Sequence, residues 1–593
     1  MEATRKIISG NEAIARSFTD SGGVFASGYP GTPSTETLEE VARIGEVYCE
    51  WAPNEKVGLE SAIGASIAGG RAMATMKHVG VNVAADALLT LNYTGVNAGL
   101  VLMVADDPGM HSSQNEQDSR NYAKFAKIPM LDPSDSQEAY DFLREGFALS
   151  ERFDTPVMLR TTTRISHAKG VVERKERIEP KVGDWVKNVP KYVMLPNYGK
   201  IRHAVVEERL RKLREFAETT PMNRVEAGDP SLGILTSGVS YQYVKEAYPD
   251  ASILKLGMVH PLPERMIREF AGKVSRFMIV EELDGIFEEQ VRAMGIRVDI
   301  GKDRIPYCDE VNADVVRAAV AGTASAAGPS PAPDLPQRPP TFCPGCSHRG
   351  LFSILAKLKV FVSGDIGCYT LGALPPMQAM HSCICMGASI SAAHGMAKVN
   401  EIAGRPGKPV AVIGDSTFFH SGMTGLLGMA YNGGNALVVI MDNRTTGMTG
   451  GQDNPGSGRG LMGQATRQVD IIELVRVLGI GNVFEINAYD LKATEAAIRK
   501  GLETPGPYVL VDRNPCILRY RVKRPTLAVD PDKCTGCRAC LKVACTALGL
   551  VAGGDKPKVR IDPEICNGCG VCSKHCRFDA ISPSKAGGYN GNF

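Results

Sequence analysis

The stretches PVAVIGDS (409–416) and ALVVIMDN (436–443) decide the fold of the region around them. Each is a short apolar run that ends in polar residues, which is typical of a buried strand followed by a turn. If the strands are parallel neighbours, Asp415 and Asn443 reach the same carboxyl edge of a sheet, where α/β folds bind phosphates. Mg²⁺ accepts such oxygen ligands, so Asp415, Asn443 and the carbonyl of Thr445 are candidates for a magnesium site. An ordinary strand-to-helix turn is the alternative.

The same alternation of strand-like and helical segments continues along most of the chain. It predicts doubly wound parallel-sheet α/β domains at residues 1–185, 186–321 and 341–525. The second is entered through a helix in YGKIRHAVVEERLRKLREFAE (198–218), and its predicted strands include SILKLGMV (252–259). Residues 322–340, GTASAAGPSPAPDLPQRPP, lack apolar periodicity and predict a linker.

Charge and composition exclude several classes of function. Lys plus Arg (67) nearly equals Asp plus Glu (65), so charge favours neither nucleic acid nor a membrane surface as a partner. No stretch approaches the roughly 20 apolar residues that span a bilayer, and the start lacks the apolar core of a secretory signal. We therefore expect a cytoplasmic protein, in which most of the 16 cysteines are reduced metal ligands.

The end of the chain contains two similar cysteine runs, CTGCRAC (534–540) and CNGCGVC (566–572). In a two-cluster ferredoxin, three thiolates of each [4Fe-4S] cluster come from one run and the fourth comes from beside the other run. This pattern predicts an α+β ferredoxin-like domain at 526–593. It assigns one cluster to Cys534, Cys537, Cys540 and Cys576, and the other to Cys545, Cys566, Cys569 and Cys572.

Two departures from the usual ferredoxin pattern are visible in these runs. Four residues rather than three separate Cys540 from Cys545, and Thr546 and Arg577 replace the proline that often follows the fourth cysteine. A pair of zinc sites is the alternative, although zinc usually takes two cysteines from each run.

The motifs GDS (414–416), DN (442–443) and TTGMTGGQ (445–452) closely resemble the thiamine diphosphate domain of pyruvate and related 2-oxoacid:ferredoxin oxidoreductases. Over nearly the full length, the domain order is most similar to the large (alpha) subunit of the indolepyruvate members. The resemblance implies thiamine diphosphate with Mg²⁺ bound by Asp415, Asn443 and the Thr445 carbonyl. It places Gly387, Gly414, Ser416 and Cys368 beside the cofactor.

The resemblance also implies a third [4Fe-4S] cluster close to the thiamine. Its ligands would be Cys343, Cys346, Cys368 and Cys516. A zinc site or buried free thiols are the alternatives. Cys383 and Cys385 are possible substitute ligands, whereas Cys49 and Cys308 have no patterned neighbour and are expected to be structural.

Two residues of the first domain match catalytic positions of the family. Glu60 would be the carboxylate that activates the cofactor's aminopyrimidine ring, although without the resemblance it is one solvated acid among many. Thr32, in the turn YPGTP (29–33), would contact the oxoacid, unless the turn binds no ligand. The polar segment ADDPGMHSSQNEQDSR (105–120) could also face the active site.

The implied reaction is the oxidative decarboxylation of an aryl 2-oxoacid, such as indolepyruvate, with CoA to give acyl-CoA and CO₂. Electrons would pass to ferredoxin, and a smaller beta subunit would complete an oxygen-sensitive α2β2 enzyme. The alternatives are an oxidoreductase for pyruvate or a branched-chain oxoacid, a non-oxidative thiamine-dependent decarboxylase, and an electron-transfer protein built on an inactive α/β scaffold.

Overall fold

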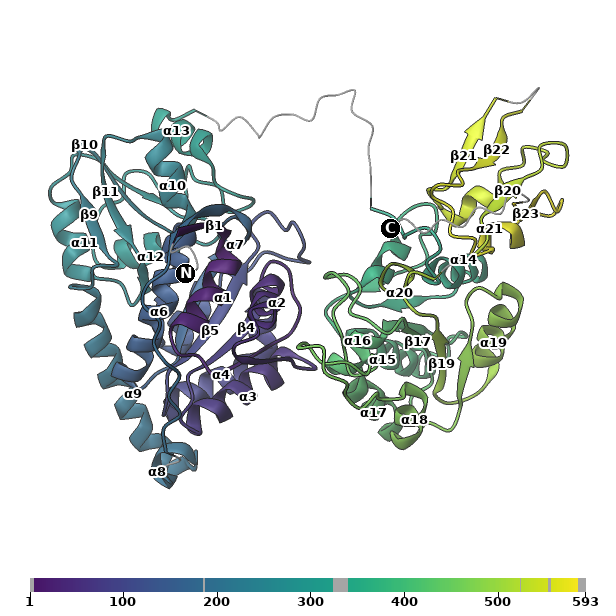
Figure 1. Cartoon of the computed structure of the whole chain (residues 1–593), viewed down its shortest axis with the longest axis horizontal. Helices are drawn as coiled ribbons and strands as arrows, with labels where there is room; N and C mark the ends of the chain where they lie inside the picture. Colours follow the sequence, from purple (N-terminus) through teal and green to yellow (C-terminus); the bar gives the residue numbers. More distant parts are fainter. Residues whose placement is uncertain (1–4, 185–186, 324–339, 523, 553–555, 585–593) are drawn as a thin grey trace. The chain divides into compact units, whose positions relative to one another are not determined.

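The computed structural model describes residues 5–184, 187–323, 340–522, 524–552 and 556–584. The chain divides into two compact units, Met1–Leu335 and Pro336–Phe593, which are described one at a time (Figure 1). The predicted boundary at 185 and most of the linker predicted at 322–340 lie outside the described residues.

The first unit contains a seven-stranded sheet in the order β12-β6-β7-β5-β4-β2-β3. Six of these strands run parallel, and β12 pairs antiparallel with β6. Every residue of β4, β5 and β7 is buried, as expected for a parallel sheet covered by helices. The strands are β2 (Phe25–Gly28), β3 (Tyr48–Trp51), β4 (Ala72–Lys77), β5 (Leu100–Asp106), β6 (Met130–Leu131), β7 (Val157–Thr162) and β12 (Met258–His260).

Two helices of this domain begin at the same edge of its sheet. Helix α3 (Glu55–Ile67) begins where the Asn54 side chain accepts a hydrogen bond from the Val57 N–H at 2.9 Å, which caps the helix. Helix α4 (His78–Thr94) starts directly after β4. Their first turns therefore lie at the carboxyl edge of the sheet.

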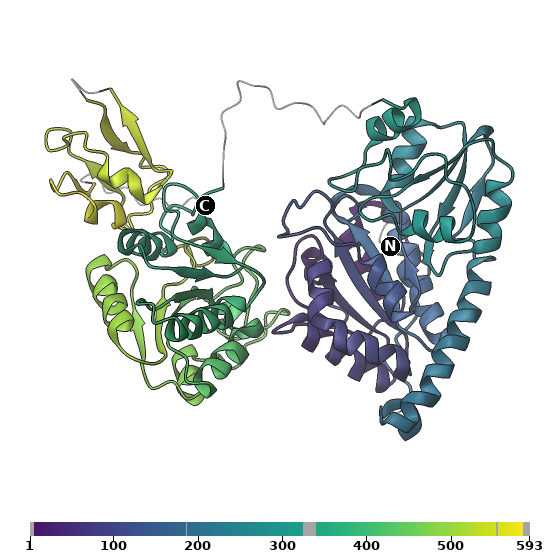
Figure 2. The ribbon, with the colours of Figure 1, turned by 180° about the vertical axis from the view of Figure 1, so that it is seen from behind.

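The second domain has four strands in the order β13-β10-β11-β9. The predicted bridging helix is confirmed as α9 (Pro196–Ala217), which Figure 2 shows along one side of the first unit. Its buried residues recur at helical spacing, so one face packs on the unit. The strands are β9 (Arg224–Glu226), β10 (Asp229–Ser237), β11 (Ala251–Leu256) and β13 (Phe277–Val280).

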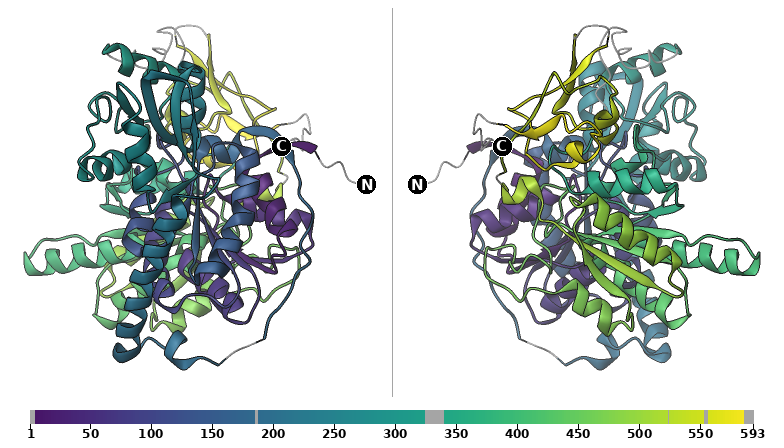
Figure 3. Two further views of the ribbon diagram at one scale, coloured as in Figure 1. Left: turned by 90° about the vertical axis from the view of Figure 1, so that its left-hand side faces the viewer. Right: turned by 90° about the vertical axis from the view of Figure 1, so that its right-hand side faces the viewer.

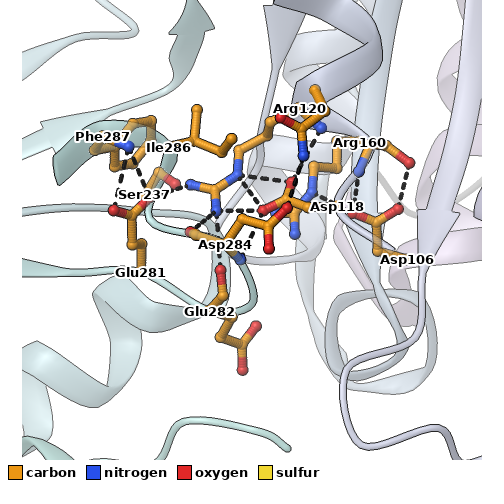
Figure 4. Close-up of polar contacts among 12 residues, drawn as sticks. Asp106, Asp118, Arg120, Arg160, Ser237, Glu281, Glu282, Asp284, Ile286 and Phe287 are labelled. Atoms are coloured by element: carbon orange, nitrogen blue, oxygen red, sulfur yellow. Dashed lines mark hydrogen bonds and ion pairs between the residues drawn. The ribbon is translucent and has the colours of Figure 1, made fainter. Parts of the chain in front are cut away.

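A buried ion network joins the first two domains (Figure 4). Arg120 contacts Asp118 at 2.6 Å and Glu281, just after β13, at 2.7 Å. Arg160 of β7 contacts Asp106 at 2.7 Å. Both guanidinium groups are buried, and such charges are tolerated only when they are paired and hydrogen-bonded. The network therefore helps to fix the two domains of this unit against each other.

The third domain has a six-stranded parallel sheet in the order β15-β14-β16-β17-β19-β18. Alternate residues of β16 enter different cores, with Val410 and Val412 on one face and Ala411 and Ile413 on the other. The predicted doubly wound sheet is confirmed. Its strands are β14 (Val362–Gly364), β15 (Ser382–Cys383), β16 (Val410–Gly414), β17 (Leu437–Asp442), β18 (Val483–Ile486) and β19 (Tyr508–Arg513).

The tail is a small α+β domain, seen in yellow in Figures 2 and 3. It contains two antiparallel strand pairs, β20 (Leu527–Val529) with β23 (Ile581–Pro583), and β21 (Leu548–Val551) with β22 (Lys558–Ile561). Short helical turns η3 (Ala539–Val543) and α21 (Val571–Lys574) carry cysteines. Its apolar core includes Cys540, Cys566 and Cys572, so these three cysteines point inward.

Candidate functional site

The predicted magnesium ligands lie together at the carboxyl edge of the third domain's sheet. Strands β16 and β17 are parallel neighbours, as predicted, so their ends bring Asp415 and Asn443 side by side. The N–H of Thr445 donates hydrogen bonds to Oδ2 of Asp415 and Oδ1 of Asn443, both at 3.1 Å. Because one backbone group contacts both oxygens, they are close enough to share a cation.

The surroundings of Asp415 favour a bound cation. Burial, followed by the negative charge of Asp442, raises the pKa of Asp415 to about 7. The carboxylate accepts hydrogen bonds from the Ser416 N–H at 2.8 Å and the Asn454 side-chain amide at 3.2 Å. No basic side chain of the described residues is ion-paired with it. Mg²⁺ would supply the missing positive charge, so this donor set fits the metal.

The predicted cofactor-contacting residues surround the same edge. Gly387 (φ 87°) immediately precedes α15 (Ala388–Ile402), where a Cβ atom would lie 2.2 Å from Ser421 Oγ. Asp365, after β14, fixes this helix start by accepting hydrogen bonds from the N–H groups of Gly387 at 2.8 Å and Ser389 at 2.9 Å. Sequence reasoning missed Asp365, although an acid directly after an apolar strand was visible. Ser416 Oγ lies 2.8 Å from Thr446 Oγ1.

Four cysteines of the third domain form one group, here called the domain set: Cys343, Cys346, Cys368 and Cys516. Burial raises the pKa of Cys368 to about 11, and the charges of Cys343 and Cys516 add to the shift. Burial also raises the pKa of Cys346, with Cys368 and Cys343 adding to it. Because these charge effects act at short range, the four thiols are neighbours in the structure.

The domain set adjoins the magnesium motif. The Cys516 N–H donates a 2.9 Å hydrogen bond to the Asn443 carbonyl. A Cβ atom on Gly447 would lie 3.4 Å from Cys368 Sγ. Cys383 and Cys385 instead have Asp365 as a charged neighbour, which adds to the effect of burial in raising the pKa of each thiol.

The tail cysteines form two groups in the structure. Those assigned to the first cluster all line one apolar cavity of the tail, together with Val529, Val559 and Ile581. We call them the first tail set: Cys534, Cys537, Cys540 and Cys576. Burial raises the pKa of Cys540, and the other three members add to the shift.

The remaining tail cysteines form the second tail set: Cys545, Cys566, Cys569 and Cys572. Burial raises the pKa of Cys572 to about 12, followed by the charges of the other three members. Thiols held together with raised pKa values need a positive centre to become thiolates, which an iron core supplies. Within the described residues, no group of three or more His, Cys, Asp or Glu side chains is arranged to hold one metal ion.

A polar cluster occupies the carboxyl edge of the first domain's sheet. The Lys77 ammonium, at the end of β4, donates a 2.6 Å hydrogen bond to the Ser112 carbonyl, and burial lowers the pKa of Lys77 to about 8. Ser112 Oγ in turn donates to the Thr32 carbonyl at 3.1 Å. A Cβ atom on Gly31 would lie 3.1 Å from Lys77 Cβ, so the turn at Thr32 packs closely on this lysine. Sequence reasoning missed Lys77, although a charge ends an apolar strand.

Helix α3 presents two glutamates in different surroundings. Glu60, predicted from the resemblance as the activating carboxylate, has a side chain that is 47% exposed and ion-paired with Lys56. Glu55 is only 5% exposed. Its Oε1 would lie 2.8 Å from a Cβ atom on Gly80, in the first turn of α4. Of the two glutamates, Glu55 is therefore the buried one that faces the first turn of α4 at the carboxyl edge of this sheet.

The polar segment after β5 makes ion pairs with the second domain. Arg120 belongs to the ion network between the first two domains. His111 Nε2 lies 3.3 Å from Glu310 Oε2.

Among the described helices, none combines the length and the hydrophobicity that a bilayer span requires.

Three family models match the chain. Residues 20–191 match "Pyruvate flavodoxin/ferredoxin oxidoreductase, thiamine diP-bdg", residues 365–511 match "Thiamine pyrophosphate enzyme, C-terminal TPP binding domain", and residues 559–582 match "4Fe-4S binding domain". Together with the fold, these matches define the class as thiamine diphosphate-dependent 2-oxoacid:ferredoxin oxidoreductases with iron–sulfur binding.

Three relatives named Indolepyruvate oxidoreductase subunit IorA match nearly the whole chain. The protein of Pyrococcus horikoshii is 41% identical over 91% of this chain and 91% of its own length. That of Archaeoglobus fulgidus is 41% identical over 99% and 98%, and that of Methanothermobacter thermautotrophicus is 39% identical over 92% and 93%. The chain belongs to this family of IorA subunits.

Proposed function

We propose that the chain is the catalytic subunit of an indolepyruvate:ferredoxin oxidoreductase. It would decarboxylate aryl 2-oxoacids oxidatively with CoA, yielding acyl-CoA and CO₂, and pass the electrons to ferredoxin. The contact of Cys516 with Asn443 carries this proposal, because it puts a four-cysteine set directly beside the magnesium motif. A thiamine enzyme without such a set would have no route for electrons. The choice of indolepyruvate rests on the names of the relatives.

The residues of the chain would divide the work as follows. Thiamine diphosphate, when bound, supplies the chemistry that releases CO₂ from a 2-oxoacid. Asp415, Asn443 and the Thr445 carbonyl would bind Mg²⁺ and so orient the diphosphate. Glu55, in place of Glu60, would be the activating carboxylate. Thr32 would hydrogen-bond the oxoacid.

The cofactors and partners follow from the same assignment. The domain set and both tail sets would each hold one [4Fe-4S] cluster, and ferredoxin would take the electrons. A smaller beta subunit would complete an α2β2 enzyme in the cytoplasm.

The experiment is anaerobic co-expression with the smaller subunit. We expect about twelve iron atoms per chain, by the four-iron stoichiometry of each cubane, together with bound thiamine diphosphate. Ferredoxin reduction should require CoA and be faster with indolepyruvate than with pyruvate. Zinc in place of iron, or no bound thiamine, contradicts the proposal. An aldehyde product formed without ferredoxin reduction indicates a non-oxidative decarboxylase.

A further inference from the structure

Arg349 is a fully buried cation that has no carboxylate partner in the described part of the chain. It lies in the first turn of α14 (His348–Leu358) and is 0% exposed. The buried Arg120 and Arg160 have carboxylate oxygens within 2.7 Å. Among the described residues, none forms an ion pair with Arg349. Because an unpaired buried charge is strongly unfavourable, this environment calls for another anion close by.

The guanidinium of Arg349 binds two cysteine-bearing loops at once. It donates to the carbonyls of Phe342 and Cys343, the latter at 3.2 Å, at the start of the domain set. It also donates to the carbonyls of Val543, at 2.5 Å, and Ala544, directly before Cys545 of the second tail set. All of these acceptors are neutral, so they satisfy its hydrogen bonds but not its charge.

Further contacts join the loop at Cys343 to the second cysteine run and to Tyr489. The Asn567 side-chain amide, within the second cysteine run, donates to the Pro344 carbonyl at 2.7 Å. The Tyr489 hydroxyl donates to the Gly345 carbonyl at 2.6 Å. Gly345 has φ 81°, and a Cβ atom there would lie 2.8 Å from Asn567 Cβ. Glycine is therefore required where the loops touch.

We propose that Arg349 is the counter-cation shared by the clusters of the domain set and the second tail set, and that it raises the reduction potentials of both. A [4Fe-4S] core on four thiolates is a net anion and gains a further negative charge on reduction, so a nearby cation favours the reduced form. In support, Arg349 donates to the carbonyl of Cys343, a member of the domain set, and to the carbonyl of Ala544, which directly precedes Cys545 of the second tail set. The inference rests on the proposed iron–sulfur function.

The test uses the complete enzyme with its smaller subunit, prepared without oxygen. Arg349→Gln removes the charge, and Arg349→Lys keeps the charge but loses the forked geometry. Arg560→Gln, at an exposed position of β22, is the matched control. Iron content is measured first, and an EPR-monitored redox titration then gives the potential of each cluster. In Arg349→Gln, we expect two potentials to shift to more negative values while the third stays, and Arg349→Lys should be close to wild type.

Each outcome decides between the possibilities. Full iron with three unchanged potentials in Arg349→Gln, or an equal shift of all three, overturns the inference. If Arg349→Gln loses iron, the Arg349→Lys variant decides. Full iron and near-wild-type potentials in Arg349→Lys support a role of the charge. Loss of iron in Arg349→Lys as well shows that Arg349 has a purely structural role, which overturns the inference. If the wild-type enzyme itself binds no iron, the proposed function fails first.

Discussion

At the scale of single residues, Glu55 and Glu60 separate two interpretations of one helix. Replacing the activating carboxylate should remove proton transfer worth about 10²- to 10⁴-fold in rate, the usual range for a general acid or base. We expect this loss of indolepyruvate-dependent ferredoxin reduction in Glu55→Gln and almost none in Glu60→Gln. Both variants should keep their iron and thiamine. The opposite pattern, with Glu60→Gln inactive, would restore the prediction made from the resemblance.

Asp415 provides a test of the magnesium site. Asp415→Ala removes a predicted Mg²⁺ ligand, so thiamine diphosphate binding should weaken by about 100-fold or more, because loss of a supporting residue alone costs about 10- to 100-fold in metal affinity. Isothermal titration with thiamine diphosphate and Mg²⁺ measures the change. Asp453→Ala is the control, since Asp453 lies in the same glycine-rich loop but pairs with Arg519 at 3.2 Å. Equal affinity of the two variants argues against Asp415 as a ligand.

These residues also show what the sequence could and could not predict about the site. Asp415 and Asn443 end apolar strands, and strand order brings such ends together, so local pattern was sufficient. The cysteine sets followed from spacing and resemblance. Glu55 and Glu60 are both acids on α3, and they are distinguished by the burial of Glu55 and its packing against Gly80, which the sequence does not show. The environments of Lys77 and Arg349 likewise arise from contacts between segments distant in sequence, so the sequence alone could not predict them.

At the scale of elements, long-range packing explains the main difference from the predicted strands. SILKLGMV was predicted as one strand, but β11 ends at Leu256 and β12 joins the sheet of the first domain. Between them, a Cβ atom on Gly257 would lie 2.6 Å from Phe142 Cζ. Phe142 lies far away in the sequence, so the apolar pattern of residues 252–259 could not predict that the strand breaks at Gly257.

The segment after β13 makes a pH-dependent contribution to stability. Burial raises the pKa of Glu282 from 4.5 to about 7. Between these pH values the folded chain keeps a proton that the unfolded chain has released, so this group lowers the free energy of unfolding as pH rises. The decrease in the free energy of unfolding reaches about 3 kcal/mol near pH 7 and does not grow at higher pH.

Glu282→Gln stays neutral and should remove this decline. Denaturant unfolding at pH 5 and pH 8 would show the variant gaining stability over wild type only at the higher pH. Glu269→Gln, at an exposed position of α11 (Glu264–Ala271), is the control. A stability difference that does not change with pH would indicate that Glu282 is already ionised in the folded protein at pH 5.

At the scale of the whole molecule, iron content tests the third cluster. Cys516→Ser removes one ligand of the domain set, so iron should fall from about twelve to about eight atoms per chain. Cys385→Ser should leave iron unchanged, because its charged neighbour is Asp365. Anaerobic iron analysis of both variants provides the measurement. If Cys516→Ser keeps all its iron, the domain set holds no cluster or has another ligand.

Strand β12 follows β11 of the second domain but completes the sheet of the first domain, and this matters when the protein is divided into fragments. A fragment that ended at the predicted boundary near residue 185 would lack β12 and leave one edge of β6 unpaired. Exposed strand edges recruit other chains, so such a fragment would tend to precipitate. Trimming the first unit safely means keeping residues well beyond His260.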